Sequence, residues 1–194
     1  MKRKTVVLAM AASIFGAFGC SAQNASAERV VAEPGKILVA YYSYSGNTRF
    51  AAEQIRNVTG GDLFEIKPVK AYPADYNACV ELAKKEINAG VRPELAENVR
   101  DFAKYDVIFV GSPNWWGTMA PPVATFLTRN DVAGKTVVPF FTHGGGGMQR
   151  CESDVRKLCP NARVLKAATF SGGSIRSAGK AIADWVGKSV TIKK

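Results

Sequence analysis

The sequence predicts an α/β fold: a doubly wound, five-stranded parallel sheet with helices on both faces. Apolar, strand-like runs alternate with helical patterns from about residue 36 to residue 187. This alternation is typical of parallel strands joined by helical crossovers. The first and third apolar runs are nearly continuous, as expected for strands that helices cover on both sides. Neither an internal repeat nor a second domain is apparent.

The five expected strands are separated by turn residues or by helical patterns. Pro139 lies inside the fourth strand, where it removes one donor from the hydrogen-bond ladder. We keep this strand because large apolar residues surround the proline on both sides. The expected strands are Lys36–Tyr42, Leu63–Ile66, Val107–Val110, Thr136–Thr142 and Arg163–Phe170.

The expected helices follow these strands in turn. In the first helix, Ala51, Ile55 and Val58 share one face, and Gly60 ends the pattern. The segment Asn88–Asp101 shows neither a helix nor a strand pattern. The other four expected helices are Asp75–Ile87, one starting near Pro121-Pro122, Gln149–Leu158, and Ser177–Val186 with Gly187 as its stop.

Residues 1–27 have the pattern of a secretory signal peptide. A basic start precedes a short apolar stretch, and the small residues Ala25-Ser26-Ala27 precede Glu28. We expect residues 28–35 to be a linker and residues 36–194 the folded domain of an exported, periplasmic protein. Cys20 offers an alternative, because Ala17–Cys20 loosely resembles a bacterial lipoprotein cleavage site. The protein would be bound to a membrane only if it were lipidated at Cys20.

The charge of the chain is basic, with a formal net charge of +10. Removal of residues 1–27 leaves 23 basic and 16 acidic residues, a net charge of +7. Such a surface can attract acidic partners or anionic lipid. No cluster of basic residues is interleaved with aromatic residues, so we expect no nucleic-acid partner.

Three cysteines remain after the signal sequence. Cys151 and Cys159 lie in or beside one expected helix, where eight residues correspond to about 12 Å. A disulfide spans roughly 7 Å at most between Cα atoms, so the pattern favours separate buried thiols, Cys79 included. With a single histidine and no Cys-x-x-Cys pair, the chain is not expected to hold a structural metal.

The loop Ser43–Thr48 stands between the first strand and the first helix. Backbone N–H groups at a helix N-terminus attract anions, and the helix dipole adds to this attraction. Ser43, Ser45 and Thr48 add hydroxyl donors, and Gly46 permits close approach of the backbone. The pattern therefore fits a phosphate site, although an ordinary strand-to-helix turn with a Ser or Asn cap remains an alternative.

Two further loops are expected at the same edge of the sheet, where such folds bind ligands. Gly111–Thr118 contains adjacent tryptophans, which can stack on a flat ring or pack in the core. Thr142–Gly147 contains four consecutive glycines, which form either a flexible loop or a wall of backbone amides. A phosphate site, an aromatic wall and a glycine wall together describe a site for flavin mononucleotide (FMN).

The pattern Ser43-x-Ser45-Gly46-Asn47-Thr48 resembles the phosphate loop of flavodoxins, and the other two loops resemble their flavin loops. The resemblance covers about residues 35–187. It implies the strand order 2-1-3-4-5, bound FMN and electron transfer. The FMN-binding residues that it implies are Ser43, Ser45, Gly46, Asn47, Thr48, Pro113, Asn114, Trp115, Trp116, Gly117, Thr142, His143, Gly144 and Gly145.

The expected function is electron transfer by an exported FMN protein, with a redox partner protein or a small electron acceptor. Electron-carrier flavodoxins are typically acidic and often have a tyrosine in the third loop, whereas this basic chain has glycines and then Met148. These departures favour an alternative, an FMN-dependent reductase of quinones or other small acceptors. A flavin-free binding module is a third possibility. No catalytic residue is assigned, and His143 is either a backbone contributor or a proton donor.

Overall fold

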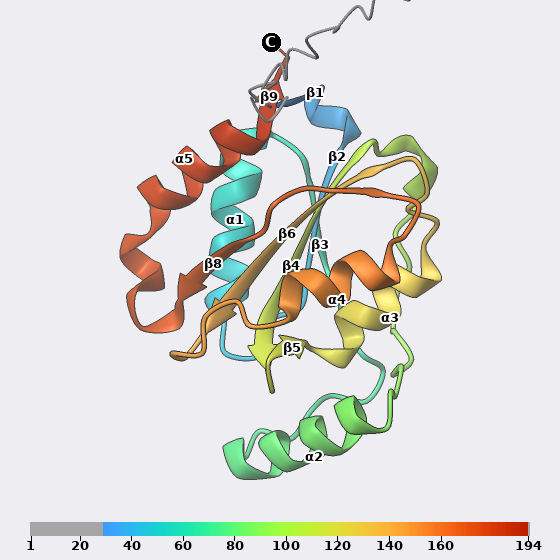
Figure 1. The fold of residues 1–194 in the computed structure, drawn as a ribbon, viewed down its shortest axis with the longest axis vertical. Coiled ribbons are helices and arrows are strands. Elements are labelled where there is room, and N and C mark those ends of the chain that lie inside the picture. Colours follow the sequence, from blue (N-terminus) through green and yellow to red (C-terminus); the bar gives the residue numbers. More distant parts are fainter. Residues whose placement is uncertain (1–28, 194) are drawn as a thin grey trace, which may run out of the picture.

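The computed structural model describes residues 29–193, whose main sheet is mostly parallel and lies between two pairs of helices (Figure 1). Its five principal positions follow the chain order 2-1-3-4-5, so the predicted fold class and strand order are correct. The strands in spatial order are β3 (Asp62–Glu65), β2 (Ile37–Tyr41), β4 (Val107–Trp115), β6 (Thr136–His143) and, at the last position, β7 (Arg163–Val164) and β8 (Ala168–Ser171).

Four helices cover the two faces of this sheet (Figure 1). α1 (Asn47–Thr59) and α5 (Gly179–Ser189) lie on one face, and α3 (Pro121–Arg129) and α4 (Cys151–Leu158) lie on the other. Strand β6 supplies both cores, because consecutive side chains of a strand point to opposite faces. Its Phe140 and Phe141 are both fully buried, in the first and second core respectively.

Helix α2 (Tyr76–Asn88) occupies a different place from the other helices. It lies beyond the carboxyl ends of the strands instead of on a face of the sheet (Figure 1). Its predicted start is confirmed, since the Asp75 carboxylate accepts a hydrogen bond of 2.8 Å from the Ala78 N–H. The two buried side chains of α2, Cys79 and Ala83, belong to neither of the main cores.

The predicted fifth strand, Arg163–Phe170, is wrong as a continuous element. Val137 of β6 accepts a hydrogen bond of 2.9 Å from the Leu165 N–H. Backbone groups alternate in direction along a strand, so Pro139 faces the same neighbour two residues later. Pro139 has no N–H to donate at that point, and the neighbouring strand is interrupted between β7 and β8.

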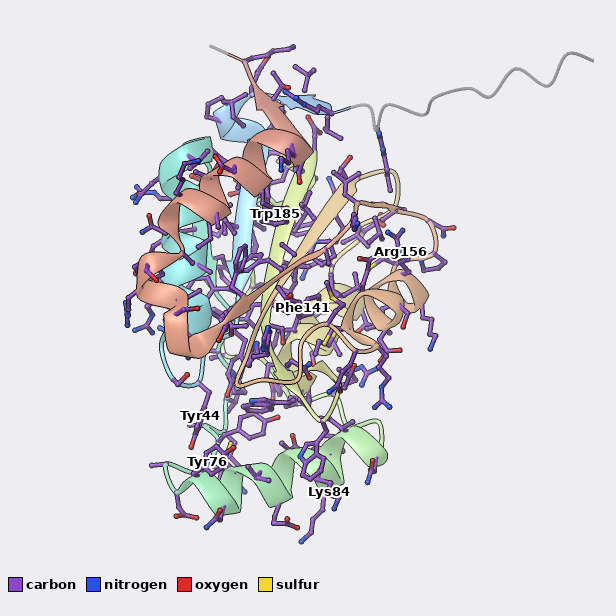
Figure 2. All side chains as sticks on the ribbon, turned by 60° about the vertical axis from the view of Figure 1, so that its left-hand side comes forward. Tyr44, Tyr76, Lys84, Phe141, Arg156 and Trp185 are labelled. Atoms are coloured by element: carbon purple, nitrogen blue, oxygen red, sulfur yellow. The ribbon has the colours of Figure 1, made fainter. Side chains whose placement is uncertain are left out.

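Side chains of α4 replace the missing ladder bonds at this interruption. The Arg156 guanidinium donates to the carbonyl oxygens of Val164, at 2.7 Å, and Leu165, at 3.3 Å. Glu152 accepts a hydrogen bond of 2.9 Å from the Ala167 N–H and pairs with Arg156. Figure 2 shows Arg156 between α4 and this segment. The interruption is thus stabilised by two charged side chains.

Three predicted helix details differ from the structure. Val58 is 40 % exposed and lies off the buried face of α1, although Gly60 ends this helix in the left-handed conformation as predicted. Helix α4 begins at Cys151 and not at Gln149, because Gln149 has a φ of 45°. The predicted stop at Gly187 is wrong: α5 continues to Ser189, and the following buried, extended Val190 begins a strand.

The two ends of the described chain pair with each other. β1 (Val30–Ala32) is parallel to β9 (Val190–Ile192), so part of the predicted linker 28–35 is a strand. A 3-10 turn, η1 (Pro34–Lys36), joins this strand to β2. The predicted signal peptide and Cys20 lie outside residues 29–193. Within that range, we find no helix with the length and apolar composition needed to cross a membrane.

The segment without a predicted element lies between α2 and β4. Pro68 and Leu95 form an isolated antiparallel bridge, and Leu95 is buried in the second core. A short 3-10 turn, η2 (Phe102–Lys104), then leads into β4. The segment therefore returns the chain from α2 to the sheet without a long helix or strand of its own.

The prediction of separate buried thiols is confirmed. Cys79, Cys151 and Cys159 are all free and buried. Burial raises the pKa of Cys151 to about 12 and the pKa of Cys159 to about 11. These two thiols therefore remain protonated and poorly reactive at neutral pH.

Candidate functional site

The N-terminus of α1 is open toward solvent. Gly46 precedes the helix in the left-handed conformation, with a φ of 85°, and no described side chain caps the helix. The Gly46 carbonyl accepts a hydrogen bond of 3.0 Å from the Phe50 N–H, which is the first hydrogen bond of the helix. The first turn contains no acidic residue. Its free N–H groups and the helix dipole can therefore receive an anion.

Hydroxyl groups surround this helix end. The Ser43 Oγ is buried and has no hydrogen-bond partner among residues 29–193, whereas Ser45 is exposed. The buried Thr48 Oγ1 lies 2.8 Å from the Thr142 Oγ1, so it joins the first loop to β6. One of these two threonine hydroxyls donates to the other, and the second keeps its hydrogen for a further partner. The orphaned Ser43 hydroxyl in particular requires an acceptor or donor that the described residues do not supply.

Arg176 also lies at this helix end, and the sequence analysis missed it. It belongs to η3 (Gly172–Ser177), the 3-10 segment that follows β8. Its Nη2 atom lies 3.9 Å from the position that a Cβ would take at Gly46. Its guanidinium carbon lies 4.9 Å from the centre of the Phe50 ring on α1. The chain thus places a cation beside the predicted anion site.

The second predicted loop is more regular than expected. β4 continues through Pro113 and Asn114 to Trp115, and β5 (Thr118–Met119) pairs with it antiparallel. Trp116 has a φ of 52° and Gly117 a φ of 83°, so the chain reverses at these two residues. The Asn114 Oδ1 accepts the Gly117 N–H at 3.0 Å and holds the turn closed. The tryptophans therefore lie on a defined hairpin.

The two tryptophans have different surroundings. Trp115 is partly buried and packs edge-on against Tyr42, Tyr44 and Tyr72, with ring centres 5.5, 5.9 and 4.9 Å away. Trp116 is 47 % exposed, and its Nε1–H donates to the α2 backbone at 3.1 Å. Packing in the core thus explains Trp115, whereas Trp116 retains exposed surface and has the Lys84 Nζ 4.7 Å from its ring centre.

In the third loop, the His143 ring organises the glycines. The His143 Nδ1 accepts a hydrogen bond of 3.1 Å from the Gly145 N–H. Gly145 and Gly147 have φ values of 139° and 66°, which favour glycine. Gly144 is exposed, with open space where a Cβ would be. This geometry supports a structural contribution from His143 and leaves backbone amides exposed along the loop.

Direct bonds join the second and third loops. The Asn114 Nδ2 donates to the Gly147 carbonyl at 2.7 Å, and the Arg150 N–H donates to the Gly117 carbonyl at 3.1 Å. Gln149, which the sequence analysis missed, lies between these loops. A Cβ at Gly117 would lie 2.3 Å from the Gln149 Oε1. The three predicted loops therefore meet at one edge of the sheet.

Comparison with known proteins identifies the family. Residues 36–189 match the sequence profile of a family described as flavodoxin. The chain belongs to the flavodoxin family. The matched range includes all three loops that meet at the sheet edge.

Solved structures agree with this membership. A protein classed as a flavoprotein from Bacteroides uniformis is 31 % identical, with a TM-score of 0.71, over 80 % of this chain and 99 % of its own. A similar protein from Bacteroides eggerthii is 33 % identical, with a TM-score of 0.65, over 76 % and 98 %. A flavoprotein from Lactobacillus acidophilus, solved in complex with FMN, is 28 % identical, with a TM-score of 0.64, over 74 % and 97 %.

A hollow of about 280 Å³ lies between α2 and the first two loops of this flavodoxin-family site. Figure 2 shows Tyr44 and Tyr76 close together at α2, below the sheet. Among residues 29–193, no Lys, Arg, Asp or Glu side chain lines it, and burial raises the pKa of the Cys79 thiol, so the lining itself is uncharged near neutral pH. The Lys84 cation is at its rim, where its Nζ lies 4.7 Å from the centre of the Trp116 ring. Its lining residues are Tyr44, Tyr76, Cys79, Val80, Ala83, Asn114, Trp115 and Trp116.

Proposed function

We propose that this member of the flavodoxin family binds FMN and transfers electrons, with the FMN phosphate at the N-terminus of α1. The observation that carries the proposal is the uncapped helix end beside the orphaned, buried Ser43 hydroxyl. The FMN complex of the Lactobacillus acidophilus relative supports the choice of cofactor. FMN, when bound, supplies one- and two-electron redox chemistry.

The chain's residues divide into three roles under this proposal. Backbone N–H groups and hydroxyls of the first loop hold the phosphate, and Thr48 ties that loop to Thr142. Asn114 and Gly117 position the hairpin that presents Trp116 to the flavin ring, while Trp115 supports the hairpin from the core. The glycine loop offers backbone amides to the polar edge of the ring. The proposed FMN-binding residues are Ser43, Ser45, Gly46, Asn47, Thr48, Pro113, Asn114, Trp116, Gly117, Thr142, His143, Gly144 and Gly145.

A double substitution in the first loop tests this assignment. We expect Ser45→Ala combined with Thr48→Val to weaken FMN binding. The loss of binding free energy should be about 1.5–3 kcal/mol for each hydroxyl bond to the charged phosphate. Riboflavin, which has the same ring but no phosphate, should lose much less affinity. Titration of flavin fluorescence measures both affinities.

The matched control is Thr59→Val on the same helix. Thr59 is also buried, but its hydroxyl bonds to the Ile55 carbonyl at 2.9 Å, at the opposite end of α1. This variant should leave both flavin affinities unchanged. Equal losses of FMN and riboflavin in the double variant would show that the loop does not hold the phosphate.

The hollow beside α2 favours a second candidate function, an FMN-dependent reductase of small acceptors. Its aromatic, uncharged walls suit a flat neutral molecule such as a quinone, and Asn114 and Trp116 belong to both the hollow and the proposed flavin site. Reoxidation of the reduced, FMN-loaded protein by 1,4-naphthoquinone should slow in Ala83→Phe, which fills the hollow. An unchanged rate in this variant would exclude the hollow as the acceptor site.

We also propose that the protein is exported by residues 1–27. In support, the sequence has a basic start, a short apolar stretch and the small residues Ala25-Ser26-Ala27 before Glu28. Mass spectrometry of the mature protein distinguishes a start at Glu28 from a lipidated start at Cys20. A chain that keeps residues 1–27 and remains in the cytoplasm would contradict export.

A further inference from the structure

We propose that Arg176 provides the positive charge that balances the phosphate of FMN and thereby selects FMN over uncharged flavins. This inference rests on the proposed function, in which the phosphate lies at the N-terminus of α1. It adds a residue that no pattern in the first loop predicts. Arg176 is far from that loop in the sequence and reaches it only through the fold of the segment after β8.

The position of Arg176 is the first argument. Its Nη2 lies 3.9 Å from the Cβ position of Gly46, the residue that opens α1. Its guanidinium packs over the Phe50 ring, with 4.9 Å between the guanidinium carbon and the ring centre. This contact holds the charged group along the first turn of α1, beside the free N–H groups.

The second argument concerns the partners of nearby cations. Arg49, also on the first turn of α1, pairs with Glu65. Arg176 makes no ion pair within residues 29–193; its described contact is with the neutral Phe50. Arg176 is therefore a cation at this helix end that has no ion-pair partner in the described part of the chain.

The third argument is that the segment carrying Arg176 is fixed against the site. Its neighbour Ile175 is fully buried in the core beside α1. A Cβ at Gly172 would lie 2.5 Å from the Asn47 Nδ2 and 3.5 Å from the His143 carbonyl oxygen, so only glycine permits this close packing. The start of η3 thus touches the first and third loops, and the buried Ile175 fixes the segment that carries Arg176.

The chemistry of the phosphate explains why a cation is useful here. A phosphate monoester carries close to two negative charges at neutral pH, whereas a helix N-terminus contributes about half a positive charge. Hydroxyl groups add hydrogen bonds but no charge. A guanidinium can bind two phosphate oxygens at once through its planar fork, which adds both charge and orientation.

The test is a comparison of FMN and riboflavin binding to Arg176→Met by fluorescence titration at low and high salt. We expect FMN affinity to fall about tenfold or more, the scale of a lost charge-assisted contact, and riboflavin affinity to stay within about twofold. The salt dependence of FMN binding should also decrease, because one phosphate–cation contact is removed. Arg176→Lys keeps the charge without the fork and should lie between the wild type and Arg176→Met.

Arg56→Met is the charge-matched control. Arg56 lies near the opposite end of α1, so its removal changes the net charge equally but leaves the proposed phosphate site intact. Equal losses of FMN and riboflavin in Arg176→Met, or no loss of either, would overturn the role of Arg176. If Arg176→Met fails to fold, two results together would overturn the role of Arg176. These are a folded Arg176→Lys that binds FMN with wild-type affinity, and a wild-type protein whose FMN affinity does not change with salt. If the wild type itself takes up no FMN, the proposed function fails together with this inference.

Discussion

Gly111→Ala is expected to destabilise the protein by about 3 kcal/mol or more, the upper range for an overpacked core. A Cβ at Gly111 would lie 2.2 Å from the Phe140 Cζ and 2.5 Å from its Cε2. The Phe140 ring cannot yield easily, because it is fully buried and packs against Trp185, with 6.4 Å between ring centres. Gly111 and Phe140 are partners in the pairing of β4 with β6, so the added methyl group would push these two strands apart.

Gly187→Ala is the matched control for this substitution. Gly187 lies within α5, and nothing lies within 4 Å of the position that its Cβ would take. Alanine should therefore stabilise the helix by about 0.5–1 kcal/mol. Urea denaturation measures both variants. A small, equal change in the free energy of unfolding of the two variants would show that β4 and β6 are not packed as described.

The second large effect concerns the tryptophan pair. Trp115→Ala should lower the free energy of unfolding by about 3–5 kcal/mol, because it removes a large side chain packed among three tyrosines. Trp116→Ala should cost little stability, because this side chain is 47 % exposed. It should instead weaken FMN binding by about 1–3 kcal/mol, because an aromatic contact with the flavin ring is lost.

Thermal melting and flavin titration of the two single variants separate these effects. Each variant serves as the control for the other, since both remove an indole from the same hairpin. If Trp115→Ala weakens FMN binding and Trp116→Ala lowers stability, then Trp115 contacts the flavin. If both variants lose only stability, the flavin ring lies away from this hairpin.

The parts of the fold that local sequence determines were predictable. The apolar runs identified the positions of β2 and β6, and Asp75 and Gly60 marked the start of α2 and the end of α1. The interruption of the fifth strand was not predictable from its own residues. It depends on Pro139 in a neighbouring strand and on side chains of α4, which are brought together only by the fold.

The candidate site also has parts that were predictable from local sequence and parts that were not. The loop Ser43–Thr48 was recognisable because strand, turn and helix start are consecutive in the chain. The different surroundings of Trp115 and Trp116 were not predictable, since they depend on the reversal of the chain at Trp116. Arg176 and Gln149 gave no signal, because their positions result from contacts between distant segments.

The identity of the bound flavin tests the central claim most directly. The protein is purified from its own compartment, or loaded with excess flavin, and the cofactor is released by heat and identified by chromatography. We expect FMN in an approximately equimolar amount, because the site is a single helix N-terminus with hydroxyls for one terminal phosphate and the first loop lacks the Gly-x-Gly-x-x-Gly turn of dinucleotide sites. Release of FAD, or no flavin uptake from excess FMN, would contradict the account.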